Sequence, residues 1–285
     1  MNLTNYHSHC LYCDGRADMA AFARFAAAKR FSAYGYSSHA PLPFPTAWTM
    51  EWDRMDDYLS EFRRLKEQYA GRVELCIGLE IDYLNEESHP ASARFQDLPL
   101  DYRIGSIHLL RNEQGEVVDA DLSADRYAQM IQKHFHGNLE QAVYQYYERA
   151  NRMLELGGFD ILGHADKMHH NAERYCPHVT EEDWYTRLVH THLAEAVERG
   201  YLIEINTKAF YELGVFYPDI RYFPYLHSLK ARVVVNSDAH YPERINYGRL
   251  EALQALTHAG FTTVAELHGG TWQDVPIDAC PRQAL

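Results

Sequence analysis

The stretch NYHSHCLYCDG, residues 5–15, contains two metal-binding patterns within eleven residues. His7 and His9 stand two apart and Asp14 follows, and imidazole and carboxylate are both common ligands of divalent ions. A strand predicted over residues 2–6 runs directly into the two histidines. The question for the rest of the chain is whether later strands end in the same way.

The second pattern in this stretch is a C-x-x-C formed by Cys10 and Cys13. A structural zinc site usually needs a second such pair, and Cys76, Cys176 and Cys280 are isolated. An odd number of cysteines in a chain of this length also argues against a disulfide framework. A redox-active pair stays open, but we interpret Cys10 and Cys13 as small packing residues beside the histidines.

Short apolar or β-branched runs alternate with segments of helical periodicity, a pattern typical of βα units around a parallel sheet. No repeat or linker divides the chain, so we expect one domain over residues 1–285. The connections at 40–52 and 111–137 are long, and the second should contain at least one extra helix; such loops usually shape or cover an active site. The predicted strands are 2–6, 33–37, 73–79, 102–107, 159–163, 202–206 and 232–237, and the main predicted helices are 19–30, 56–70, 139–157, 181–200 and 246–260.

Six of the seven predicted strands run into a residue that can bind a metal. In an α/β barrel the carboxyl ends of all strands lie on one face, so these residues should converge there. The alternative is that each is an ordinary surface or capping residue, but that gives no reason for them to prefer strand ends. The residues are His7 and His9, His39, Glu80, His108, His164, and Asp238 with His240.

The other histidines lie in or beside helices and loops, and we expect ordinary surface or capping roles for most of them. His169 and His170 follow the fifth strand closely, so their role stays open. The remainder are His89, His134, His136, His178, His190, His192, His227, His258 and His268.

The composition limits the classes of partner. A formal net charge of −13, with no clustered Lys or Arg, argues against a nucleic-acid partner. A small anionic substrate is still compatible with this charge, because bound metal ions would reverse it locally. No apolar run approaches the roughly 18 residues of a membrane span and the N-terminus lacks a signal-peptide layout, so we expect no membrane partner and a cytoplasmic location.

The ordered motifs resemble the polymerase-and-histidinol-phosphatase (PHP) superfamily, and the context DYRIGSIH resembles its histidinol-phosphatase branch. The motifs are HSH at 7–9 with Asp14, SSH at 37–39, GLE at 78–80, GSIH at 105–108, GHAD at 163–166 and NSDAH at 236–240. The resemblance implies a distorted seven-stranded (β/α)7 barrel, similar to a TIM barrel, with three divalent ions (zinc, manganese or iron) at the carboxyl ends of the strands. It implies one ion at His7, His9, Glu80 and Asp238, a second at Glu80, His108 and His164, and a third at Asp14, His39 and His240.

The activity implied by this resemblance is hydrolysis of a small phosphomonoester, L-histidinol phosphate, to L-histidinol and phosphate in histidine biosynthesis. A hydroxide between the first two ions would attack phosphorus, and Asp238 would orient it or handle its proton. Two alternatives remain open. One is a related phosphatase or phosphodiesterase acting on another small ester or a nucleotide, and the other is a noncatalytic metal-binding barrel.

The chain departs from the family where two arginines are expected to contact phosphate. His169 and Tyr211 stand at those positions, in GHADKMHHN and EINTKAFYE. Lys167 and Lys208 are adjacent cations that could replace the arginines, although an ammonium lacks the bidentate geometry of a guanidinium. A solvated surface position is an equal alternative for both lysines. Further candidates for the substrate pocket are Arg16 and Arg244, for which a helix-start or surface salt-bridge role is an equal alternative. The aromatic pair Phe44 and Trp48 is also a candidate, although core packing is the favoured interpretation for it.

Overall fold

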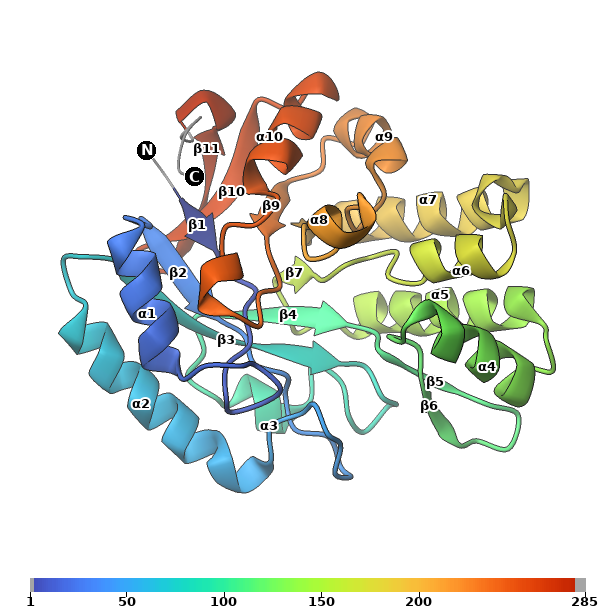
Figure 1. Cartoon of the computed structure of the whole chain (residues 1–285), viewed down its shortest axis with the longest axis horizontal. Helices are drawn as coiled ribbons and strands as arrows, with labels where there is room; N and C mark the ends of the chain where they lie inside the picture. The colour runs from blue at the N-terminus through green and yellow to red at the C-terminus, as the bar shows by residue number, and fades with distance from the viewer. Residues whose placement is uncertain (1–2, 280–285) are drawn as a thin grey trace.

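The computed structural model describes residues 3–279, and its centre is a nearly closed barrel of seven parallel strands (Figure 1). Consecutive strands along the chain are neighbours in the barrel, with helices in the crossovers, which is the α/β arrangement that the sequence predicts. Glu80 lies inside its strand, which is longer than expected. The strands are β1 (Thr4–Asn5), β2 (Ala33–Tyr36), β3 (Glu74–Asp82), β4 (Tyr102–Ser106), β7 (Ile161–Leu162), β8 (Leu202–Asn206) and β9 (Val233–Asn236).

The first and last strands meet just beyond their carboxyl ends. Ser8 and Ala239 form a parallel bridge, and the His9 amide donates to the Ala239 carbonyl at 2.8 Å. A side chain also joins the two strands, because Asn5 Oδ1 at the end of β1 accepts a hydrogen bond from the Ser237 amide, just after β9, at 2.7 Å. The HSH and NSDAH motifs are therefore brought together although they are separated by most of the chain.

A tyrosine fills the interior of the barrel near its amino-terminal end. The Tyr102 hydroxyl donates to the carbonyls of Tyr6 and Tyr36, and its ring occupies the space where a Cβ on Gly35 or Gly78 would lie. Any larger residue at either glycine would displace the ring, so these two positions require glycine for packing.

A C-terminal hairpin of β10 (Thr263–His268) and β11 (Thr271–Pro276) packs across this end of the barrel. Trp272 of the hairpin approaches Tyr6 with ring centroids 5.1 Å apart. Neither strand was predicted from the sequence. The hairpin covers the end of the barrel opposite the metal-competent residues.

The five main predicted helices are confirmed, with bounds that differ by a few residues. α2 shows why they form, because Tyr58, Phe62 and Leu65 recur at helical spacing and are buried against the barrel. The α-helices are α1 (Met19–Ala28), α2 (Met55–Gln68), α3 (Ala93–Gln96), α4 (Ala124–His134), α5 (Leu139–Leu156), α6 (His169–Tyr175), α7 (Asp183–Glu198), α8 (Phe210–Leu213), α9 (Phe223–Ser228) and α10 (Arg249–His258). Single 3₁₀ turns are Trp52–Arg54, Val179–Glu181, Ile220–Tyr222, Pro242–Arg244 and Ile277–Ala279.

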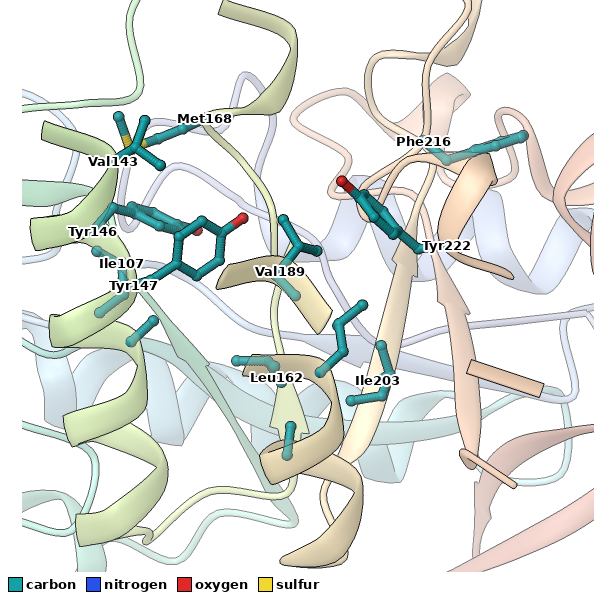
Figure 2. Close-up of a cluster of buried hydrophobic side chains, with 14 of the residues drawn as sticks. Ile107, Val143, Tyr146, Tyr147, Leu162, Met168, Val189, Ile203, Phe216 and Tyr222 are labelled. Atoms are coloured by element: carbon teal, nitrogen blue, oxygen red, sulfur yellow. The ribbon is translucent and has the colours of Figure 1, made fainter. Parts of the chain in front are cut away.

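The core under α5 and α7 is rich in tyrosine. Figure 2 shows Tyr146 and Tyr147 of α5 near Val189 of α7, above Leu162 and Ile203 of the barrel strands. These side chains are almost fully buried and fix the two helices against β7 and β8. This packing holds the adjoining carboxyl end of β7, where His164 follows, in place.

The predicted long connection after β4 contains the expected extra helix, α4, but it begins with a hairpin that the sequence did not predict. Its strands are β5 (Leu109–Arg111) and β6 (Val117–Asp119), each only three residues long. The Ala120 amide donates to the His108 carbonyl at 2.8 Å, so the hairpin is fixed beside the carboxyl end of β4.

One histidine assigned to the surface is buried instead. His192 lies on the inner face of α7, and its Nδ1 is 2.7 Å from Asn151 Oδ1. Burial lowers the pKa of His192 to about 3, so it is a neutral core residue. Among the helices of residues 3–279, none combines the length and apolar character needed to cross a bilayer.

Candidate metal centre

Glu80 lies at the middle of four of the predicted ligands. Its Oε2 is 2.9 Å from His39 Nδ1 and 3.2 Å from His7 Nε2. Its Oε1 is 2.8 Å from His164 Nε2 and 3.5 Å from His108 Nε2. Residues that follow β1, β2, β4 and β7 thus meet around one carboxylate of β3, as expected for the carboxyl face of a parallel barrel.

The remaining predicted ligands continue this cluster toward β9. His9 Nε2 is 3.1 Å from Asp238 Oδ1, and His240 Nε2 is 3.2 Å from Asp14 Oδ2. The His9 ring lies between the rings of His39 and His240, at centroid distances of 4.2 and 4.3 Å. The nine residues proposed from the sequence therefore form one continuous group.

Within this group, three sets of side chains have ligand atoms close enough to hold an ion. They differ in three respects from the sets implied by the sequence resemblance. Asp238 is not part of the set of His7, His9 and Glu80. His9 joins the set of Asp14, His39 and His240, and His39 stands where His164 was expected beside Glu80 and His108. The full sets are His9, Asp14, His39 and His240; His7, His9 and Glu80; and His39, Glu80 and His108.

The orientation of His7 indicates that a cation belongs in this group. Its Nδ1 is 2.7 Å from Glu204 Oε1, and an ionised carboxylate only accepts, so Nδ1 carries the proton. His7 Nε2 faces Glu80 Oε2 at 3.2 Å, and neither atom has a hydrogen-bond partner among the described residues. Although burial by itself would lower the pKa of His7, the surrounding carboxylates raise it, so this nitrogen lies where a cation is favoured. A metal ion could take the place of the proton, and imidazole with carboxylate is a donor set that fits a divalent ion.

The charges in the group lead to the same conclusion. Although burial by itself would raise the pKa values of Glu80 and Asp238, nearby histidines lower both, together with Lys208 in the case of Asp238. Burial and the neighbouring His39 and His240 hold the pKa of His9 well below its usual value. Although burial by itself would lower the pKa values of His7 and His108, nearby carboxylates raise both, so the group attracts positive charge that bound metal ions could supply in place of protons.

The backbone is strained at two members of the group. His164 has φ of 25° and Asp238 has φ of 47°, in a region that non-glycine residues rarely occupy. The His164 amide donates to Glu204 Oε2 at 2.9 Å, which helps to hold this conformation. Strain of this kind costs about 1–3 kcal/mol and is typical of residues whose side chains must point at a site.

Two buried carboxylates orient histidines of the group, and neither was predicted from the sequence as a site residue. Glu204 of β8 contacts His7, and Asp82 Oδ2 lies 3.0 Å from His108 Nδ1. Such pairs fix the tautomer and ring direction of a metal-binding histidine. The signal in the sequence was a glutamate inside the apolar strand LIEIN and an aspartate at the end of ELCIGLEID.

Replacing Glu204 by glutamine is expected to reduce metal affinity or turnover about 10- to 100-fold and to destabilise the protein by about 1–3 kcal/mol. Glu204 accepts hydrogen bonds on both oxygens, from His7 and Asn236 on one and from the His164 amide and Asn206 on the other. An amide can accept on only one side, and it carries no charge. Metal titration and thermal melting measure the two effects.

The matched control is Glu198→Gln, on the exposed end of α7. It should leave both quantities unchanged. Equal metal affinity and turnover in Glu204→Gln and the wild type would contradict the orienting role of Glu204.

The cysteine pair lies beside the metal-competent group but has the character of packing residues. Cys10 is buried with its Sγ 3.3 Å from Ser38 Oγ, and burial raises the pKa of its thiol to about 11. Cys13 Sγ lies 3.6 Å from His9 Nδ1, and burial raises its pKa as well. Both thiols stay protonated at neutral pH, which argues against thiolate ligands and a redox-active pair. Cys280 lies outside the described residues.

Three of the four predicted substrate cations line a cavity of about 190 Å³ next to the group. Arg16, Lys208 and Arg244 border it together with Asp238 and His240. The fourth, Lys167, is buried and forms an ion pair with Asp121. A larger hollow of about 670 Å³ lies between α10 and the C-terminal hairpin, and none of the nine predicted ligands lines it.

Comparisons with known proteins assign the chain to a family. The model of the PHP domain family matches residues 5–208, which include seven of the nine predicted ligands. The chain belongs to the PHP domain family. The PHP chain is 24% identical over 282 residues to a Schizosaccharomyces pombe protein named "Probable histidinol-phosphatase", covering 93% of this chain and 89% of the relative.

Solved structures confirm the PHP fold. A Listeria monocytogenes protein described as "putative histidinol phosphatase" is 23% identical, with a TM-score of 0.77, covering 86% of this chain and 98% of the other. Histidinol phosphate phosphatase from Lactococcus lactis, solved with zinc, L-histidinol and phosphate, is 16% identical, with a TM-score of 0.67 and coverage of 95% and 98%.

His169 and Tyr211 stand at the two positions where arginine was expected from the resemblance to histidinol phosphatases. His169 is buried, with its Nε2 3.5 Å from Asp219 Oδ2. Tyr211 is exposed and donates from its hydroxyl to Glu251 at 3.0 Å. In their place, Lys208 Nζ approaches Asp238 Oδ1 at 3.1 Å and Lys167 Nζ approaches Asp121 Oδ2 at 3.2 Å.

Proposed function

We propose that this chain is a metal-dependent phosphomonoesterase that hydrolyses L-histidinol phosphate to L-histidinol and phosphate. The observation that carries the proposal is the group of nine metal-competent side chains around Glu80, which borders a cavity lined by cations. Membership of the PHP domain family and the name of the S. pombe relative support it. A histidine-biosynthetic role and a cytoplasmic location are parts of the same proposal.

The proposed ligands are His7, His9, Asp14, His39, Glu80, His108, His164, Asp238 and His240, for three divalent ions of zinc, manganese or iron. Bound there, such ions would neutralise the phosphate dianion and lower the pKa of a water to about 7. Hydrolysis forms a bond from water oxygen to phosphorus as the bond to the alcohol oxygen breaks, and one proton must reach that oxygen.

Asp238 is the proposed catalytic residue for the attacking water. Nearby Lys208 and histidines hold its pKa well below the usual value, so it is an acceptor and not a proton donor. Asn206 Nδ2 donates to Asp238 Oδ2 at 3.3 Å, and Lys208 Nζ donates to its Oδ1. These contacts fix the carboxylate so that it can orient the attacking water, while its low pKa makes it a weak base.

The phosphate oxygens are proposed to contact Lys208, Arg16 and Arg244, which line the cavity, and Lys167, which does not line it. Lys167 is almost fully buried, and its ammonium is positioned by Asp121 and lies 5.2 Å from the centroid of the Tyr217 ring. Although burial would raise the pKa of Asp121, Lys167 and Lys208 lower it, so the pair stays ionised. One buried and one exposed lysine thus supply positive charge near the positions where the related enzymes are expected to have arginines.

A panel of phosphate esters tests the proposal. After loading with manganese or zinc, the enzyme should hydrolyse L-histidinol phosphate with a kcat/KM at least about tenfold higher than other small phosphomonoesters or nucleotides. Phosphate release at several substrate concentrations measures this. A preference for another ester would overturn the substrate, and no hydrolysis of any ester by the metal-loaded protein would overturn the enzymatic function.

A further inference from the structure

The loop between β2 and α2 brings an indole ring to the edge of the metal centre. The ring of Trp48 approaches His39 and His108 edge-on, with centroids 4.8 and 5.4 Å away. Trp48 is only half-buried, whereas both histidines are buried. Part of the indole therefore remains available to a molecule that enters the centre from this side.

The loop holds Trp48 in place before any ligand arrives. Thr46 Oγ1 accepts from the amides of Trp48 and Thr49, at 3.3 and 2.9 Å, and forms a tight turn. The Met50 amide donates to the His39 carbonyl at 3.1 Å, which ties the end of the loop to a proposed ligand.

An apolar cluster supports the loop from below. Leu42, Leu84 and Leu109 are buried together, and Phe44, Trp48 and Val117 pack against them. Because Leu109 and Val117 belong to β5 and β6, the loop rests on the hairpin that follows β4. Trp48 therefore packs against apolar side chains in this cluster and also contacts two histidines of the metal centre.

The charges around the centre are distributed unevenly about Trp48. Three of the proposed phosphate-binding cations line the cavity beside Asp238 and His240, whereas Trp48 touches His39 and His108. A phosphomonoester with its phosphate toward this cavity would direct its alcohol portion to the other side of the centre, where Trp48 borders His39 and His108.

An indole face favours flat rings and cations, because stacking and cation–π attraction both act on it. It offers little to a phosphate or to a flexible hydroxylated chain. We propose that Trp48 is a specificity residue that contacts the leaving alcohol and selects one with a flat, nitrogen-containing aromatic ring. This inference rests on the proposed phosphomonoesterase function and assigns the side of the centre that recognises the alcohol.

The test compares two substrates of similar charge, L-histidinol phosphate and serinol phosphate, which has an amine but no ring. In Trp48→Leu, kcat/KM for L-histidinol phosphate should fall about tenfold, mainly through KM, and kcat/KM for serinol phosphate should change less than about twofold. Trp48→Phe should retain most of the preference because it keeps an aromatic face. The matched control is Trp52→Leu, since Trp52 stacks on Phe95 at 5.4 Å and touches none of the proposed ligands in the described contacts.

A second measurement does not depend on turnover. Calorimetric binding of L-histidinol to the metal-loaded protein should weaken about tenfold in Trp48→Leu and remain unchanged in Trp52→Leu. Equal losses for both substrates, or unchanged L-histidinol binding in Trp48→Leu, would overturn the role of Trp48. Absence of phosphatase activity in the wild type would instead overturn the proposed function, and the binding comparison would still decide the role of Trp48.

Discussion

Glu80→Gln is expected to lower kcat by roughly 10³-fold or more and to reduce the bound metal per chain. The Glu80 carboxylate lies within 3.5 Å of nitrogens of four histidines, and both of its oxygens face them. Glutamine has nearly the same shape but no charge, and its amide nitrogen cannot bind an ion. Steady-state phosphate release and elemental analysis of the purified variant measure the two effects.

The same substitution at Glu87 is the control, because Glu87 is exposed in the loop after β3. It should retain full activity and metal content. Glu80→Gln with wild-type kcat and metal content would remove the central carboxylate from the proposed ligand set, and with it the bridging arrangement of the ions.

Removing the metal with a chelator is expected to abolish activity and to lower the melting temperature by roughly 5 °C or more. Without cations, several buried polar atoms of the group have no hydrogen-bond partner among the described residues, including His7 Nε2 and Glu80 Oε2. Binding at about 100 times Kd stabilises a folded protein by about 2.7 kcal/mol for each site, and several sites add to this. Differential scanning calorimetry and activity assays after dialysis measure both changes.

Adding back zinc or manganese should restore both quantities, with close to three ions per chain by elemental analysis. Magnesium is the control ion, since it prefers an oxygen shell and suits a histidine-rich group poorly. A chelated protein that keeps its activity and melting temperature, or a reconstituted enzyme with fewer than two ions, would contradict the proposed centre.

The periodicity of the sequence was sufficient for the barrel strands and main helices, and it failed for the two hairpins. β5 and β6 have three residues each, too few for a period to appear. β11 is largely exposed and polar, and it forms because Trp272 packs against Tyr6 at the end of the barrel. Short or exposed strands such as these form through tertiary contacts, so the local pattern of apolar residues does not predict them.

The kind of site follows from the order of residues along the chain, because strands that alternate with helices form a parallel sheet whose carboxyl ends share one face. His7, Glu80, His164 and Asp238 could therefore be grouped before their positions were known. How their side chains face one another depends on the folded barrel. Barrel closure brings Glu204 to His7 and His39 to Glu80. Trp48 reaches His108 because its loop rests on the hairpin of β5 and β6. These contacts join segments far apart in the chain, and their geometry is set by packing, which local sequence patterns do not encode.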